Sequence, residues 1–251
     1  MKVSDKSRKV LVIGATSAIA HECAKCFAAK AASFVLVGRN GAHLESVAGD
    51  LEARGAERVT RLVADVTDDS RHGEIVRTAD EQFGGLDLVL IAHGSLPDQR
   101  ECESDSALVL RELNTNAIST ICLVTAIAAV MEKRRSGCIA VISSVAGDRG
   151  RRSNYVYGAA KSAVSVFLEG LRSRLHGSGV SVVTIKPGFI DTPMTAHLPK
   201  NPLFASAASA GKAVHDVMLR PRDVVYVPWF WRWIMLAVRL VPGPIFKRLP
   251  L

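Results

Sequence analysis

The chain has 251 residues, of which 48% are hydrophobic and 22% are charged, and its formal net charge is +8. This balance is typical of a globular protein with one full-sized core and excludes a largely disordered chain. The positive charge favours anionic partners such as phosphates or anionic lipids. No basic stripe with interleaved aromatic residues occurs, so we expect no nucleic-acid partner.

The first nine residues, M-K-V-S-D-K-S-R-K, are mostly polar and run directly into a strand-like segment. They offer neither the apolar core nor the cleavage site of a secretory signal, so we expect a cytoplasmic location. Five cysteines are scattered without the spacing of a disulfide framework. Cys23 and Cys26 lie inside a predicted helix with no second pair elsewhere, so we interpret them as structural and expect no metal site.

Apolar segments alternate with longer segments of helical periodicity. Strands are predicted at 9–14, 33–38, 58–63, 86–92, 138–143, 180–185 and 223–228, and helices near 18–30, 41–54, 69–82, 106–133, 154–176 and 206–218. Strands that are apolar throughout and separated by helices form parallel sheets covered on both faces. Residues 1–228 are therefore predicted to form one α/β domain, a doubly wound Rossmann sheet of about seven strands with ligands at the carboxyl ends.

The first predicted strand and helix are joined by small residues, I-G-A-T-S-A-I-A (13–20). The glycine can take the tight turn, and the backbone N–H groups at the helix start can cradle a pyrophosphate. Such a loop is weak support alone, but its place after the first strand predicts a dinucleotide site. The residues expected there are Gly14, Thr16, Ser17, Ala18 and Ile19.

The second predicted strand ends in Gly38 and Arg39. An enzyme that uses NAD usually carries an acidic residue here for the ribose hydroxyls, whereas Arg39 offers a guanidinium that can bind a 2′-phosphate. The sequence therefore favours NADP(H), with NAD(H) as the alternative. The other interpretation of Arg39 is that it is a solvated loop cation that binds no ligand.

A more specific pattern joins Ser144, at the end of the fifth predicted strand, to Tyr157 and Lys161. Residues four apart on a helix share a face, so the Lys161 ammonium can lie beside the Tyr157 phenol and lower its pKa. Tyr157 could then exchange a proton with a carbonyl oxygen that receives hydride, while Ser144 hydrogen-bonds the same oxygen. Tyr155 is expected to be a neighbour without that role.

On these residues the chain resembles the short-chain dehydrogenase/reductase family over nearly its whole length. The resemblance implies a fourth catalytic residue, Asn116 in L-N-T-N (113–116), with Asn114 as the alternative, and a proton relay through a water. It also implies cofactor contacts in A-D-V (64–66), I-A-H-G (91–94) and K-P-G-F-I-D-T (186–192). The residues concerned are Asp65, Val66, Ala92, His93, Gly94, Pro187, Gly188, Ile190 and Thr192, together with Tyr157 and Lys161.

Two departures from the family pattern stand out. The segment I-A-H-G replaces the family's Asn-Asn-Ala-Gly, and the first loop carries alanines at positions 18 and 20. Both concern the cofactor rather than the proton-transfer group. His93 could be a catalytic base, but we favour a packing or cofactor-lining role.

A narrower resemblance, to the reductase branch acting on decaprenylphosphoryl-2-keto-erythro-pentofuranose, comes from G-D-R-G-R-R-S-N-Y-V-Y-G (147–158), M-T-A-H-L (194–198) and I-F-K-R-L-P-L (245–251). It implies reduction of a keto-sugar carried on a polyprenyl phosphate. Arg149, Arg151 and Arg152 lie between the serine and the tyrosine and could hold the substrate phosphate. The alternative is a solvated or subunit-contact loop.

Residues 229–251 form a separate aromatic and basic segment that contains all three tryptophans. The segment holds Arg232, Arg239, Lys247 and Arg248 and no acidic residue. Its apolar stretch is too short to span a bilayer. One interpretation is an amphipathic helix on the inner face of the membrane, and the other is a helix packed over the substrate cleft or a subunit interface.

The sequence thus predicts an oxidoreductase that acts on a small-molecule or lipid-linked sugar, with a homo-oligomer expected. Two alternatives stay open. One is a reductase of a soluble apolar ketone or acyl substrate, and the other is a non-catalytic NADP(H)-binding scaffold. The complete serine, tyrosine, lysine and asparagine set argues against the scaffold, because cofactor binding alone does not need the serine.

Overall fold

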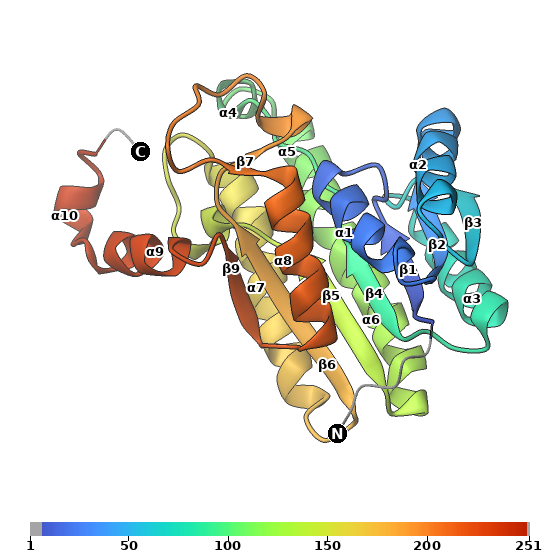
Figure 1. The fold of residues 1–251 in the computed structure, drawn as a ribbon. Coiled ribbons are helices and arrows are strands. Elements are labelled where there is room, and N and C mark those ends of the chain that lie inside the picture. The colour runs from blue at the N-terminus through green and yellow to red at the C-terminus, as the bar shows by residue number, and fades with distance from the viewer. Residues whose placement is uncertain (1–6, 250–251) are drawn as a thin grey trace.

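The computed structural model describes residues 7–249, and a parallel seven-stranded sheet runs through it between two layers of helices (Figure 1). The strand order is β3-β2-β1-β4-β5-β6-β9, with every neighbouring pair parallel. The predicted doubly wound sheet is therefore confirmed. Its strands are β1 (Lys9–Ile13), β2 (Ser33–Gly38), β3 (Arg58–Val63), β4 (Leu88–Ile91), β5 (Gly137–Ile142), β6 (Val180–Pro187) and β9 (Val224–Val227).

Helices cover both faces of the sheet because each turns an apolar stripe toward it. Phe27 and Leu44 belong to the core on one face, and Ile127 and Val164 belong to the core on the other. The first face carries α1 (Ala18–Ala28), α2 (Gly41–Ala53) and α8 (Ala207–Leu219), and the second carries α3 (His72–Phe83), α6 (Ser119–Arg134) and α7 (Tyr155–Arg174).

The helix predicted near 106–133 is interrupted. It consists of α5 (Ser106–Leu113), a π-helical turn at Asn114–Ile118, and α6. By length and composition alone this helix could cross a membrane, but residues such as Leu123 are fully buried against the sheet. It is a core helix in this fold, and its π-turn is the kind of irregularity often found at functional sites.

The short elements that were not predicted include α4 (Gln99–Cys102), β7 (Ile190–Asp191) and β8 (Ala205–Ser206). Each is too short to give a periodic pattern in the sequence. The β7–β8 pair lies above the carboxyl edge of the main sheet (Figure 1). These elements therefore shape the surroundings of the edge where ligands were expected.

Cys23 is buried on α1, and Cys26 is partly buried one turn further along the same helix. Burial raises the pKa of both thiols. A raised pKa keeps a thiol protonated and poorly reactive, which supports the structural interpretation.

Residues 229–249, which we call the C-terminal arm, contain α9 (Trp231–Leu240) and α10 (Gly243–Phe246) and extend beyond the sheet on its β9 side (Figure 1). Trp231 is 3% exposed and packs against Val145, whereas Trp229 and Trp233 are 73% and 57% exposed. One face of α9 therefore packs on the protein, and the other faces solvent. The last two residues of the predicted segment, 250–251, lie outside the described residues.

Candidate active site

A cleft of about 400 Å³ opens at the carboxyl ends of the central strands, where the order of the sheet reverses between β1 and β4. In doubly wound folds this is the usual ligand position. The structure brings most of the predicted site residues to its walls. They are Gly14, Thr16, Ser17, Ala18, Ile19, Arg39, Val66, Ala92, His93, Gly94, Ser144, Arg151, Tyr157, Lys161, Pro187, Gly188, Ile190 and Thr192.

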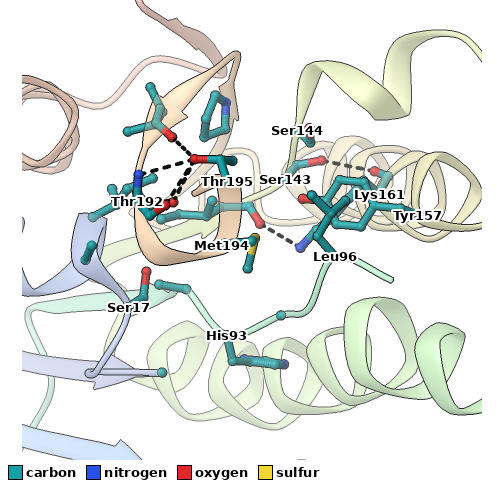
Figure 2. Close-up of a pocket in the computed structure, with 18 of the residues that line it drawn as sticks. Ser17, His93, Leu96, Ser143, Ser144, Tyr157, Lys161, Thr192, Met194 and Thr195 are labelled. Carbon is teal, nitrogen blue, oxygen red and sulfur yellow. Dashed lines mark hydrogen bonds between the residues drawn. The ribbon is translucent and has the colours of Figure 1, made fainter. Parts of the chain in front are cut away.

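Ser144, Tyr157 and Lys161 lie together at one end of the cleft, and Ser17 lies at the opposite end (Figure 2). Ser144 follows β5, and the other two residues project from the first two turns of α7. The two neighbouring serines differ in their contacts. Ser143 is 1% exposed and bonds the Lys161 carbonyl and the Ser165 hydroxyl, so only Ser144 lies beside the Tyr157 hydroxyl.

The two titrating groups of this cluster are both shifted by burial. Burial raises the pKa of Tyr157 to about 12, although a hydrogen bond with Ser144 acts in the opposite direction. Burial lowers the pKa of Lys161 to about 8. The Lys161 Nζ lies 5.7 Å from the centre of the Tyr157 ring and donates to the Ile142 carbonyl at 3.2 Å. The predicted lowering of the Tyr157 pKa is therefore wrong for this structure, because desolvation outweighs the hydrogen bond with Ser144.

Asn116 lies behind this cluster, in the π-helical turn, and is fully buried. Its Oδ1 accepts from the Ser95 backbone N–H at 3.1 Å, and its Nδ2 donates to Glu112 and to the Ser95 hydroxyl, also at 3.1 Å. The ring of hydrogen bonds fixes the orientation of the amide. A Cβ placed on Gly94 would lie 2.7 Å from Asn116 Oδ1 and 3.4 Å from Lys161 Nζ, so the asparagine and the lysine approach the same glycine.

His93 is recessed in the cleft wall, and its Nε2 lies 2.9 Å from the Ser119 hydroxyl and 3.2 Å from the Thr120 hydroxyl. Burial, and then the Lys161 charge, lower the pKa of His93 to about 3. The ring is therefore neutral at ordinary pH and held by α6, which supports a packing or cofactor-lining role over that of a base.

The opposite half of the cleft fits a dinucleotide. Gly14 has φ +78, and a Cβ at this position would lie 2.5 Å from the His93 backbone nitrogen, so both conformation and space require glycine. The N-cap residue of α1, Ser17, makes no side-chain capping bond, which leaves the helix start available to an anion. Arg39 is exposed on the cleft rim, with no hydrogen bond or ion pair from its side chain among residues 7–249.

Four predicted residues lie outside the cleft lining: Asp65, Asn116, Arg149 and Arg152. The Asp65 carboxylate accepts from the Thr67 backbone and hydroxyl at 2.9 and 2.8 Å. Partial burial raises the Asp65 pKa, but these bonds outweigh it and the net pKa is lowered. Asp65 is thus an ionised side chain next to the lining residues Ala64 and Val66.

The three arginines between the serine and the tyrosine have different surroundings. Arg149 donates to the carbonyls of Val238 and Val241, near the end of α9, and its guanidinium lies 3.7 Å from the centre of the Phe246 ring. Arg152 is exposed, and only Arg151 lines the cleft. The loop does not gather the three cations into one group.

Sequence reasoning missed most of the apolar lining. The missed residues include Leu96, Phe189, Met194 and Leu198, and Asn154 also went unnamed. The segment from Ile190 to Leu198 covers the cleft, with Thr192 and Met194 turned toward it (Figure 2). Thr195 holds this cover by donating to the Ile190 carbonyl at 2.6 Å. The motif M-T-A-H-L contained the signal, but nothing in its pattern showed which side chains turn inward.

Comparison with known proteins agrees with this geometry. The family model described as short chain dehydrogenase matches residues 8–203. The chain therefore belongs to the short-chain dehydrogenase family, as the resemblance implied, and is an oxidoreductase of a family that binds NAD(P).

Relatives with similar sequences are also named as oxidoreductases. The chain is 35% identical over 241 residues to an uncharacterized oxidoreductase of Mycobacterium tuberculosis, with 96% of each chain covered. It is 33% identical over 247 residues to an uncharacterized oxidoreductase of Streptomyces coelicolor, with 98% of this chain and 97% of that protein covered. These names specify no substrate, so the narrower branch stays a prediction.

Two solved structures share the fold. The crystal structure of gox2181 superposes with a TM-score of 0.81 at 19% identity, covering 90% of this chain and 96% of that one. A putative short-chain alcohol dehydrogenase from Sinorhizobium meliloti gives 0.80 at 23% identity, covering 91% and 98%. At this level of identity the likeness concerns the fold alone.

Proposed function

We propose that the protein is an NADP(H)-dependent carbonyl reductase in which Tyr157 is the general acid. The observation that carries this proposal is the grouping of Ser144, Tyr157 and Lys161 at one end of a cleft whose other end fits a dinucleotide. Bound NADP(H) supplies the hydride. The protein's own residues orient the carbonyl and provide the proton.

The roles follow from the contacts of each group. A phenol with a pKa near 12 is protonated at neutral pH, so Tyr157 carries the proton that the carbonyl oxygen takes up in reduction. Ser144 accepts from the Ala146 N–H at 3.1 Å and keeps its own proton for the same oxygen. On this proposal Lys161 returns a proton to Tyr157 from solvent through a water next to Asn116, since Lys161 and Asn116 both approach Gly94.

Arg39 supports NADP(H) over NAD(H), because a guanidinium without an intramolecular partner suits a 2′-phosphate. Replacing Arg39 with Asp should raise the Michaelis constant for NADPH at least about tenfold relative to that for NADH, because loss of one charge-assisted contact is worth more than about 1.4 kcal/mol. Initial rates with both cofactors measure the ratio, and an unchanged ratio would contradict the assignment.

For the substrate we favour a keto-sugar carried on a polyprenyl phosphate. The apolar cover formed by Leu96, Met194 and Leu198 supports a substrate with an apolar part. The solvent-facing aromatic side of α9, with its cations and without acids, supports contact with an anionic membrane surface. On this proposal the protein is cytoplasmic, at the inner face of the membrane, and a homo-oligomer.

A direct assay separates this proposal from its alternatives. Purified protein and NADPH are incubated with a keto-sugar phosphodiester, with a soluble apolar ketone and without substrate, while NADPH absorbance is followed. Loss of NADPH mainly with the first supports the lipid-linked sugar, and loss mainly with the second supports the soluble ketone. NADPH binding without oxidation in any mixture would identify a scaffold.

A further inference from the structure

The loop between Ser144 and α7 carries two polar groups that its own chain leaves without partners. The Arg151 Nε and the Asn154 Oδ1 are both buried and make no hydrogen bond among residues 7–249. Both residues line the cleft close to Tyr157 in sequence. Buried polar groups are nearly always paired in folded proteins, so an unpaired donor and an unpaired acceptor on one short loop point to a missing partner.

Among residues 7–249 no carboxylate forms an ion pair with Arg151. The acid nearest in sequence, Asp148, is used elsewhere, because one oxygen binds the Lys186 ammonium and the other accepts from the Tyr226 hydroxyl at 2.8 Å. The Asp148 side chain is only 2% exposed. Arg151 therefore presents a partly buried guanidinium to the cleft without an ion-pair partner among residues 7–249, and the Asp148 charge acts on it only at a distance.

Asn154 is free for a related reason. It occupies the N-cap position of α7, where an asparagine usually accepts from the first turn, yet its side chain makes no capping bond. The cap is supplied by α4 instead, since Gln99 Oε1 accepts from the Val156 N–H at 3.0 Å. The Asn154 amide is thus left beside the start of a 20-residue helix, whose dipole adds positive potential there.

The two neighbouring arginines do not line the cleft. Arg149 holds carbonyls of the C-terminal arm, and Arg152 is exposed and does not line the cleft. Of the three cations on this loop, only Arg151 can meet a ligand inside the cleft.

We propose that Arg151 and Asn154 form an anion subsite at the substrate end of the cleft, which binds a phosphate group of the substrate through Arg151 and an adjacent hydroxyl or phosphate O–H through Asn154. The inference deepens the proposed function and rests on the same cleft. A guanidinium suits this task because its planar N–H groups match two oxygens of a phosphate. The phosphate can belong to a phosphodiester on an apolar chain or to a free sugar phosphate.

Binding rather than turnover tests the subsite, so its outcome is independent of the carbonyl-reductase proposal. NADPH-loaded protein is titrated in a calorimeter with decyl phosphate below its micelle-forming concentration, with ribose 5-phosphate, and with a neutral decyl glycoside. We expect at least one phosphate probe to bind, and Arg151→Ala to weaken it at least about tenfold while the neutral probe is unaffected. Arg152→Ala is the matched control and should bind as the wild type does.

The probes also distinguish the two sources of phosphate. Preference for decyl phosphate assigns the subsite to a lipid-carried substrate, and preference for ribose 5-phosphate assigns it to a soluble one. Asn154→Ala should weaken the sugar phosphate severalfold and leave thermal stability close to that of the wild type. The proposal is overturned if neither phosphate binds, if Arg151→Ala binds as the wild type does, or if Arg152→Ala loses as much. The NADPH assay above decides separately whether the protein reduces ketones.

Discussion

The Tyr157 end of the cleft and the C-terminal arm both contain side chains whose surroundings are energetically unfavourable. In the cleft, Lys161 is 3% exposed and carries a charge with no carboxylate in contact among residues 7–249. In the arm, Trp229, Trp233 and Leu240 are large apolar side chains in solvent. Desolvated charge and exposed apolar surface are opposite departures from ordinary folding preference.

The two regions also differ in how the rest of the protein holds these unfavourable side chains in place. The cleft is fixed from several directions, since the segment after β5 supplies Ser144, α7 supplies Tyr157 and Lys161, and the π-turn before α6 supplies Asn116. The arm is attached along one face only, through Trp231, Met235 and the bonds of Arg149 to its carbonyls. We therefore expect substitutions in the cleft to alter chemistry, and substitutions in the arm to alter either stability or surface contact according to the face.

The largest effect is expected at the cleft. Tyr157→Phe removes the proton donor and should lower kcat with the best substrate about 10³-fold. NADPH binding, followed by fluorescence titration, should change far less than kcat, because the other expected cofactor contacts of the cleft remain. Tyr155→Phe is the matched control, since Tyr155 is 45% exposed on the same helix. Equal loss in the two variants would contradict the assignment of Tyr157.

The two faces of the arm give the next contrast. Trp231 packs edge-on against Phe189, with ring centres 5.1 Å apart, and its indole lies where a Cβ on Gly188 would be. Trp231→Ala should lower the free energy of unfolding by about 3 kcal/mol, as for other buried tryptophans. Trp233→Ala should stay within about 0.5 kcal/mol. Urea unfolding measures both.

The same exposed tryptophan tests the membrane proposal. Trp233→Ala should sediment less with vesicles that contain anionic lipid than the wild type does, because the exposed face of α9 would lose its aromatic anchor. Vesicles of neutral lipid are the control. Undiminished sedimentation would remove α9 from the membrane proposal.

The smallest effect concerns pH and the buried lysine. Burial lowers the Lys161 pKa from 10.5 to about 8. Between these values the unfolded chain binds a proton that the folded protein does not, so stability rises with pH across that window. Below about pH 8 both states bind the proton, and the full destabilising contribution is present. From about pH 8 to about pH 10 the gain should be about 2 kcal/mol at one proton difference.

Lys161→Met isolates this contribution, because the other groups that titrate in alkali remain. The difference in unfolding free energy between wild type and variant, measured in urea at both pH values, should change by that amount in favour of the wild type at the higher pH. A difference that stays constant would mean that Lys161 has an ordinary pKa in the folded protein.

Much of the fold could be predicted because it depends on patterns that repeat along the chain. Seven apolar strands with intervening helices have few solutions other than a doubly wound sheet, and all seven strands are found within two residues of their predicted ends. The short elements β7, β8 and α4 could not be predicted, because two to four residues carry no periodicity.

The candidate site also has features that the sequence predicts and features that it does not. Gly14 and the Ser144, Tyr157 and Lys161 spacing are local, since a turn or a helix face places them, and the sequence indicates them directly. The pKa of Tyr157 is different, because it depends on desolvation by residues distant in the chain. The sequence expectation was a lowered value, and the structure gives a raised one.

The amino-acid sequence by itself determined the class of fold, the cleft at the carboxyl edge and the spacing of Ser144, Tyr157 and Lys161, because strand patterning and helix periodicity act over short distances. Only the tertiary structure decided which of the loop arginines reaches the cleft and which face of α9 is free. Arg149 is taken by carbonyls some ninety residues further along the chain, and Arg151 is left open because Asp148 has other partners. Such partners come together only when the chain has folded, which no local pattern records.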